Sequence, residues 1–230
     1  MKTVKIAHLY PKELNLYGDI GNVICLYYRL KKRGYSVEIE NVEIGDKLGS
    51  FDILVIGGGQ DKEMNIVSTD LKRKSEMLSY CVNRGKTVFA VCAGFQLLGK
   101  YYINQQGDEM KLSSALDFYT VAGKKRMIGN MVFETPFGKI VGFENHSGKT
   151  YLSDSLKPLG RIISGFGNNG EDGGEGLIFK NTIATYAHGA VLPKNPALAD
   201  EIIKRALCCD ELPELDDEIE NRCHNSLLHS

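Results

Sequence analysis

Short apolar runs alternate with longer segments of helical spacing along the first hundred residues. Apolar residues dominate 3–9 (TVKIAHL), 51–59 (FDILVIGGG) and 87–91 (TVFAV), and helical segments are expected at 19–34 and 62–84. The first of these helical segments repeats apolar side chains every three or four residues and ends in Lys-Lys-Arg-Gly, which is typical of an amphipathic helix closed by a glycine. Strands that alternate with helices in this way predict an α/β fold in which helices flank a mostly parallel central sheet.

The second half of the chain has shorter strand candidates, separated by glycines and charged residues. They suggest antiparallel strands added to the same sheet, at 117–123, 130–135, 139–145, 176–180 and 182–188. A helix is expected at about 196–209, and the acidic stretch DELPELDDEIENR after it indicates a polar tail or a surface helix. We therefore predict one domain over residues 1–209, followed by a polar segment over 210–230.

Composition removes several classes of partner. With 28 basic and 29 acidic residues the net charge is −1, whereas proteins whose main partner is nucleic acid usually carry a basic excess. No apolar run approaches the roughly 20 residues of a membrane span, and the N-terminus lacks the features of a signal peptide, so a cytoplasmic location is expected. The six cysteines form no CxxC pair and no ligand-spaced cluster with the histidines, which predicts free thiols and no metal site.

One cysteine stands between a strand candidate and a helix. In TVFAVCAGFQLLGK, Cys92 follows the apolar run, and a helix is expected from Gly94. A sharp strand-to-helix turn strains the backbone of a nucleophile and needs small neighbours, which Ala90 and Gly94 provide. The turn also puts the thiol at a helix N-terminus, which favours thiolate, and directs N–H groups such as that of Ala93 toward a developing oxyanion. The alternative is a buried structural cysteine.

A base and a backbone donor follow two further strand candidates. His188 ends TIATYAH, and in an open parallel sheet the chemistry gathers at the carboxyl ends of the strands, so His188 and Cys92 are expected to meet. Gly57–Gly59 follow a buried strand and let backbone approach a ligand closely. Neither GxxxxGK[ST] nor GxGxxG occurs there, which argues against a phosphate loop. The alternatives are a structural histidine and a flexible turn.

Two more residues are ambiguous. Arg126, in GKKRMIGN, is either a clamp for a substrate carboxylate or a solvated surface charge. His146, in GFENHSG, is either structural or directed at a partner.

Together these segments resemble the triad-type (class I) glutamine amidotransferases, in the cobyric acid synthase-like branch. The resemblance rests on GGGQD, VCAGFQLLG, GFENHSG and YAHG, supported by LNLYGDIGN, DFYT, GFGNN and HGAVLPKNP, and it extends to about residue 209. It implies the flavodoxin-like fold of that class, and hydrolysis of L-glutamine to glutamate and ammonia through a thioester on Cys92, with His188 moving the protons. It also implies an oxyanion held by the N–H groups of Gly59 and Ala93. The substrate contacts that it implies are Arg126, for the α-carboxylate, Gln96 and Gly58.

The chain departs from the family pattern after the histidine. Many members carry a glutamate two residues further on, whereas this chain has His188-Gly189-Ala190. Without an orienting carboxylate a histidine base loses rate. The expectation is therefore a Cys-His dyad whose third acid comes from a partner subunit.

A partner is expected for a second reason. Amide synthesis requires an activated carboxylate, and the chain shows no ATP-binding motif. The resemblance implies a heterodimer with a Mur-ligase-like subunit that uses ATP and Mg²⁺ and amidates the D-glutamate of lipid II to D-isoglutamine, at the inner face of the membrane. No cofactor is expected in this chain.

Three alternatives remain open at this point. One is a glutaminase subunit for another synthetase, such as a cobyrinate-type enzyme, although those usually carry the synthetase domain on the same chain. Another is a Cys-His hydrolase of the related peptidase or deglycase type. The third is a non-catalytic interaction subunit, which the presence of both Cys92 and His188 disfavours.

Overall fold

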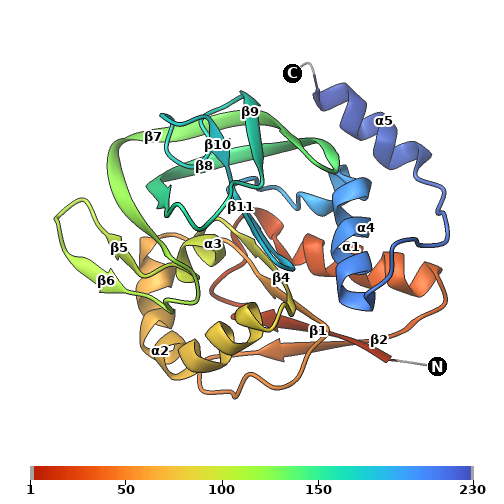
Figure 1. Ribbon diagram of the computed structural model, residues 1–230, viewed down its shortest axis with the longest axis horizontal. Helices are drawn as coiled ribbons and strands as arrows, with labels where there is room; N and C mark the ends of the chain where they lie inside the picture. The colour runs from red at the N-terminus through yellow and green to blue at the C-terminus, as the bar shows by residue number, and fades with distance from the viewer. Residues whose placement is uncertain (1–2, 229–230) are drawn as a thin grey trace.

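A twisted, mostly parallel sheet, called sheet A here, forms the centre of the molecule. The computed structural model describes residues 3–228, and within them six strands pair in the order β11-β12-β4-β3-β1-β2 (Figure 1). Every neighbouring pair is parallel apart from β11 and β12. The strands are β1 (Thr3–Leu9), β2 (Ser36–Val42), β3 (Ile53–Ile56), β4 (Thr87–Val91), β11 (Leu177–Phe179) and β12 (Thr182–Thr185).

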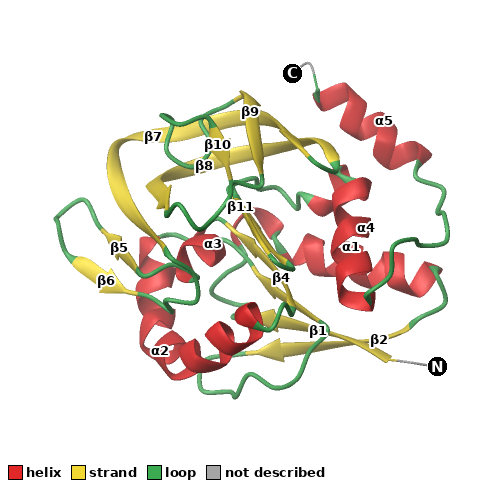
Figure 2. Cartoon of the chain, viewed as in Figure 1, coloured by secondary structure: helices red, strands yellow, loops and turns green. Residues whose placement is uncertain are grey.

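Helices cover both faces of sheet A, which explains the continuous apolar runs. Figures 1 and 2 show α2 on one side of the sheet and α1 and α4 on the other. As a result every residue of β3, β4 and β12 is buried, as expected for parallel strands covered on both faces. The helices are η1 (Leu16–Gly18), α1 (Ile20–Lys32), α2 (Asp61–Asn83), α3 (Ala93–Leu97), η2 (Leu192–Lys194), α4 (Pro196–Leu207) and α5 (Glu218–Leu227).

The helix boundaries follow from local chemistry. A reciprocal pair between Gln60 and Glu63 caps the start of α2, because each side chain accepts a hydrogen bond from the backbone N–H of the other residue. On α1 the apolar repeat buries Val23, Leu26 and Leu30 against the core. The predicted helices at 19–34, 62–84 and 196–209 therefore lie where expected, whereas the helix after Cys92 ends early, at Leu97.

Most of the second half forms a separate sheet, called sheet B here, so the expectation that all its strands join the central sheet is wrong. The segments predicted at 176–180 and 182–188 do join sheet A, as β11 and β12, whereas the other three belong to sheet B. The described strands pair in the order β10-β9-β7-β5-β6, with β8 against β7. Two of the predicted strands, 117–123 and 130–135, are one long strand, which continues through an irregular register between Ala122 and Met127. Sheet B consists of β5 (Tyr101–Ile103), β6 (Glu109–Lys111), β7 (Phe118–Thr135), β8 (Gly138–Leu152), β9 (Gly160–Ser164) and β10 (Gly174–Glu175).

The acidic segment after α4 returns to the body of the protein. The buried Arg29 guanidinium on α1 donates to Asp200 at 2.7 Å and to Asp217 at 2.6 Å, which ties α1, α4 and the entry to α5 together. Residues 229 and 230 of the predicted polar segment lie outside the described part. Among the described residues, no helix is both long and apolar enough to cross a membrane.

The loop after β1 crosses directly over the glycine turn after β3. A Cβ atom on Gly57 would lie 2.1 Å from the Leu14 carbonyl oxygen, and a Cβ on Gly94 would lie 2.5 Å from the Ile56 carbonyl oxygen. Side chains never approach backbone that closely, so these three chain segments meet only because glycine has no Cβ.

We expect Gly57→Ala to lower the free energy of unfolding by about 1–3 kcal/mol, because an added methyl group forces the two loops apart. Gly49→Ala is the control: its Cβ would meet nothing nearer than 3.8 Å, and its effect should stay within about 0.5 kcal/mol. Urea unfolding of both variants measures the difference. Equal stabilities would contradict the close approach.

Candidate active site

The carboxyl ends of neighbouring parallel strands gather the candidate residues. Strands β12, β4, β3 and β1 are consecutive in sheet A. Behind these ends come His188, Cys92, Gly57–Gly59 and the loop that leads to Asp19. Parallel pairing therefore places all of these at one edge of the sheet, where α/β proteins bind their ligands.

Cys92 sits on a strained turn between β4 and α3. Its backbone has φ 50° and ψ −106°, a conformation that residues with a side chain rarely adopt. The surroundings hold it there: the Cys92 N–H donates to the Thr185 carbonyl at 2.8 Å, and the Gly94 N–H donates to the Gly57 carbonyl at 3.1 Å. The turn presents the thiol at the N-terminus of α3, one residue before the helix begins, and at the edge of a pocket.

His188 is completely buried behind the cysteine. The backbone N–H of His188 donates to the Phe143 carbonyl at 2.7 Å, which attaches the segment after β12 to sheet B. The edge of Tyr17 packs on its ring, with 5.1 Å between centroids. Burial lowers the pKa of His188, but the Cys92 thiolate and the Asp19 carboxylate outweigh burial and raise this pKa from 6.5 to about 10. An imidazolium that faces a thiolate is the charge distribution of an activated cysteine nucleophile.

A carboxylate of this chain lies beside the histidine, whereas the sequence predicts only a Cys-His dyad within this chain. Asp19 Oδ2 is 3.6 Å from His188 Nδ1, and both side chains are fully buried. Sequence reasoning included this residue in LNLYGDIGN but did not single it out, because an aspartate before an apolar repeat is an ordinary helix start. In the structure the Asp19 side chain makes no capping bond to α1, and it points to His188 and Gly58 instead.

Gly58 supports the pair of acid and base and is not a wall of the pocket. Its N–H donates to Asp19 Oδ2 at 2.6 Å, and an added Cβ would lie 2.5 Å from His188 Cε1. Its N–H is therefore engaged with Asp19 in this structure, and a contact between Gly58 and the substrate stays a prediction. Gly59 does line the pocket, and Ala93 is buried directly after Cys92.

A pocket of about 320 Å³ opens in front of Cys92. Gln96 and Arg126, both expected as substrate contacts, lie in its wall. Gln96 is held in place by a hydrogen bond of 3.0 Å from its Nε2 to the Tyr186 hydroxyl. The volume of the pocket suits a molecule of amino-acid size. Arg126 supplies a positive charge to the same pocket.

Sequence reasoning missed two further charged residues of the pocket wall, Asp61 and Lys62. Asp61 is the one carboxylate that lines this pocket in the described part of the chain. The Tyr102 hydroxyl, on a buried side chain, lies 3.1 Å from each of its oxygens and orients them. Arg126 and Asp61 thus offer both charges that an α-amino acid zwitterion requires. The only sequence signal was the position of Asp61 directly after GGGQ.

His146 belongs to the pocket wall. Its ring stacks on Tyr186 with 3.7 Å between centroids, its Nδ1 lies 2.8 Å from the Gly148 carbonyl oxygen, and its Nε2 faces Glu144 at 3.6 Å. Because the side chain is buried, it is not an exposed contact for a partner in this structure.

Solved structures define the class of the fold. The protein superposes on PurLQS from Thermotoga maritima with a TM-score of 0.60 and 15% identity, covering 90% of this chain and 99% of that one. It superposes on the glutaminase domain of Trypanosoma brucei CTPS with a TM-score of 0.60 and 13% identity, covering 91% and 96%. These likenesses confirm the predicted α/β fold of class I glutamine amidotransferases.

The sequence then gives the family. Residues 5–196 match the CobB/CobQ-like glutamine amidotransferase domain, and the chain belongs to this family. It is 40% identical to the Staphylococcus aureus protein named lipid II isoglutaminyl synthase (glutamine-hydrolyzing) subunit GatD, over 99% of this chain and 96% of that protein. The Streptococcus pneumoniae protein of the same name is 39% identical over 89% and 80%. A probable cobyric acid synthase from Methanothermobacter thermautotrophicus is 32% identical over 66% of this chain, which spans 33% of that protein.

We expect Cys92→Ala and Asp19→Asn each to lower the pKa of His188 from about 10, because each removes a negative charge that raises it. A pH titration of histidine Cε1 by ¹³C-NMR measures this, with Cys81→Ala, a buried cysteine on α2, as the control. Unchanged titration in both variants would contradict the proximity of the three groups.

The raised pKa of His188 also predicts how stability depends on pH. The imidazolium stabilises the fold fully below about pH 6.5, and this stabilisation is lost as the pH rises through about 10.

Proposed function

We propose that this protein is the glutaminase subunit of an enzyme that amidates lipid II. It hydrolyses L-glutamine and passes ammonia to a separate Mur-ligase-like subunit, which uses ATP and Mg²⁺ to convert the D-glutamate of the lipid II stem peptide to D-isoglutamine. The observation that supports the glutaminase activity is Cys92, which has a strained backbone and lies at a pocket large enough for an amino acid. His188 and Asp19 lie behind it. The similarity to two GatD subunits over most of the chain supports the acceptor and the partner.

Glutamine binding places the side-chain amide over the thiol. Arg126 binds the α-carboxylate through parallel N–H bonds, and Asp61 accepts from the α-ammonium. Gln96, further along the wall, contacts the substrate closer to the amide. Because both charges of the amino acid are fixed, the amide carbon is held within reach of the Cys92 Sγ.

The reaction proceeds in two halves. The Cys92 thiolate attacks the amide carbon, and the oxyanion is held by the N–H groups of Gly59 and Ala93. His188 gives its proton to the departing nitrogen, so ammonia leaves and a γ-glutamyl thioester remains. A water molecule then loses a proton to His188 and attacks the thioester, which releases glutamate and restores the thiolate and imidazolium.

We assign the orienting role to Asp19 in place of an acid from the partner. At 3.6 Å the contact with His188 Nδ1 is longer than a hydrogen bond, and catalytic contacts of unliganded enzymes are often long and tighten when substrate binds. The partner is still needed to activate the acceptor carboxylate, and docking of the partner is the natural trigger for shortening this contact. The complex would carry this chain to the inner face of the membrane, where lipid II is presented.

Glutamine-dependent amidation should require Cys92, whereas ammonia-dependent amidation should not. We expect Cys92→Ala, in complex with the synthetase subunit, to lose glutamate release and glutamine-driven amidation of lipid II at least about 1,000-fold. Ammonium chloride should restore amidation, and Cys223→Ala on α5 is the control. No glutamate release by the wild-type complex would overturn the glutaminase, and release without lipid II amidation would overturn the acceptor alone.

The charges of Arg126 and Asp61 should contribute mainly to the binding of L-glutamine. We expect Arg126→Ala and Asp61→Asn each to raise KM for L-glutamine by roughly 10- to 100-fold, with a smaller effect on kcat, because each removes one charge-assisted contact. Glutaramate, which lacks the α-ammonium, separates the two: its KM should respond to Arg126→Ala and not to Asp61→Asn. Glu109→Gln, an exposed acid on β6, is the control. An unchanged KM in either variant removes that residue from the site.

A further inference from the structure

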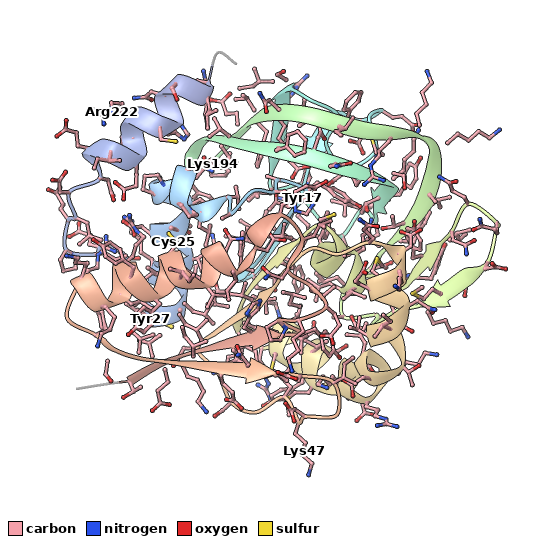
Figure 3. The ribbon with its side chains drawn as sticks, turned by 180° about the vertical axis from the view of Figure 1, so that it is seen from behind. Tyr17, Cys25, Tyr27, Lys47, Lys194 and Arg222 are labelled. Carbon is pink, nitrogen blue, oxygen red and sulfur yellow. The ribbon has the colours of Figure 1, made fainter. Side chains whose placement is uncertain are left out.

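Tyr17 holds an unfavourable backbone conformation directly above the catalytic histidine. Its φ of 57° and ψ of 22° lie in the left-handed region, in the short η1 turn before α1. Left-handed geometry disfavours residues with a side chain and persists only where neighbouring contacts enforce it. The side chain is nevertheless 45% exposed, so burial does not account for its position. Figure 3 shows Tyr17 between the start of α1 and the ribbons of sheet B.

The contacts of Tyr17 connect the substrate pocket with His188. Arg126 Nε donates to Asn145 Oδ1, and Asn145 Nδ2 donates to the Tyr17 hydroxyl. The edge of the Tyr17 ring then packs on His188 and, at 6.0 Å between centroids, on Phe143. Arg126 and Asn145 both line the pocket that holds Cys92. An unbroken series of side chains therefore runs from the carboxylate end of the pocket to the base.

The same turn also carries the acid. Leu16 N–H donates to the Gly58 carbonyl at 3.0 Å, and the Gly58 N–H donates to Asp19 Oδ2 at 2.6 Å. Tyr17 lies in the sequence between these two anchored residues, so its backbone belongs to the segment that holds Asp19 against His188. In the described part of the chain, the one hydrogen bond of the Tyr17 side chain is that from Asn145.

We propose that Tyr17 is a positioning residue that reports occupancy of the α-carboxylate subsite to His188. This rests on the proposed glutaminase function, and in particular on Arg126 as the carboxylate contact. A bound carboxylate fixes the Arg126 guanidinium, the guanidinium fixes the Asn145 amide, and the amide holds the Tyr17 ring on His188 with Asp19 in line. The guanidinium is planar, so a carboxylate bound to its terminal nitrogens fixes the direction in which Nε donates to Asn145.

The consequence is that the α-carboxylate of glutamine contributes to turnover as well as to binding. An amide without this carboxylate leaves the Arg126 guanidinium held by Asn145 alone, and the strained Tyr17 turn is then held less firmly. Such a substrate reaches Cys92 while the base is poorly oriented, which protects the enzyme against futile hydrolysis of other small amides.

The kinetic test compares L-glutamine with 4-aminobutanamide, which is glutamine without its α-carboxylate. Ammonia release is measured for the full chain alone and in complex with its synthetase subunit. Tyr17→Phe should lower kcat for L-glutamine about 3- to 10-fold, keep KM within about twofold and leave kcat for 4-aminobutanamide unchanged, because only the hydroxyl contact is lost. Asn145→Ala should add nothing to this kcat effect when it is combined with Tyr17→Phe. Tyr28→Phe, an exposed tyrosine on α1, is the control and should match the wild type.

Equal losses on both substrates would mean that Tyr17 has only a structural role, and no loss on either would remove it from the mechanism; both results overturn the proposal. A wild-type protein that releases no ammonia from L-glutamine overturns the glutaminase function itself, so the two failures are distinguishable.

A second measurement does not depend on turnover. In the Cys92→Ala background, L-glutamine should shift the His188 Cε1 resonance further than 4-aminobutanamide does, and Tyr17→Phe should abolish this difference. If saturating amounts of the two ligands shift this resonance equally in Cys92→Ala protein that retains Tyr17, the proposal is overturned.

Discussion

The position of the acid relative to the base depends on one glycine. Gly58 donates its N–H to Asp19, accepts a hydrogen bond from Leu16 and leaves open the space that the His188 ring fills. A buried carboxylate is costly unless it is hydrogen-bonded and paired, and here the backbone supplies the hydrogen bond while the imidazolium supplies the charge. Three loops from three different strands converge on this residue. Any side chain at Gly58 would separate Asp19 from His188 before it affected the rest of the fold.

Much of sheet A and two members of the site were predictable from the sequence because their signals are local. The runs in β3 and β4 are apolar on both faces and end in glycine or cysteine, so they indicate buried parallel strands that stop at a site. Cys92 directly follows β4 and His188 lies three residues after β12, and parallel pairing brings the ends of these strands together without any further information. Arg126 depended on the family resemblance, since an exposed arginine has no local signature.

The parts that were missed depend on contacts between distant segments. Asp19 precedes a helix, where aspartate is ordinary, and its true partners come from the loops after β3 and β12. Asp61 lies at the first position of α2, and the Tyr102 hydroxyl, from sheet B, lies 3.1 Å from both oxygens of its carboxylate. Glycines within β7 suggested a break between two strands, whereas the strand continues through an irregular register. Pairing of this kind is decided by tertiary packing, which no local pattern encodes.

The pocket also sorts the cysteines of this chain by chemistry. Cys208 and Cys223 are exposed and open to any electrophile, and the buried Cys81 has a pKa raised by burial. Cys92 shares its pocket with the cation of Arg126 and the anion of Asp61. An electrophile built on an amino-acid zwitterion would therefore be drawn to one thiol in six, whereas a neutral alkylating reagent would label the surface first. The charges proposed to bind the substrate would thus direct covalent chemistry to a single residue.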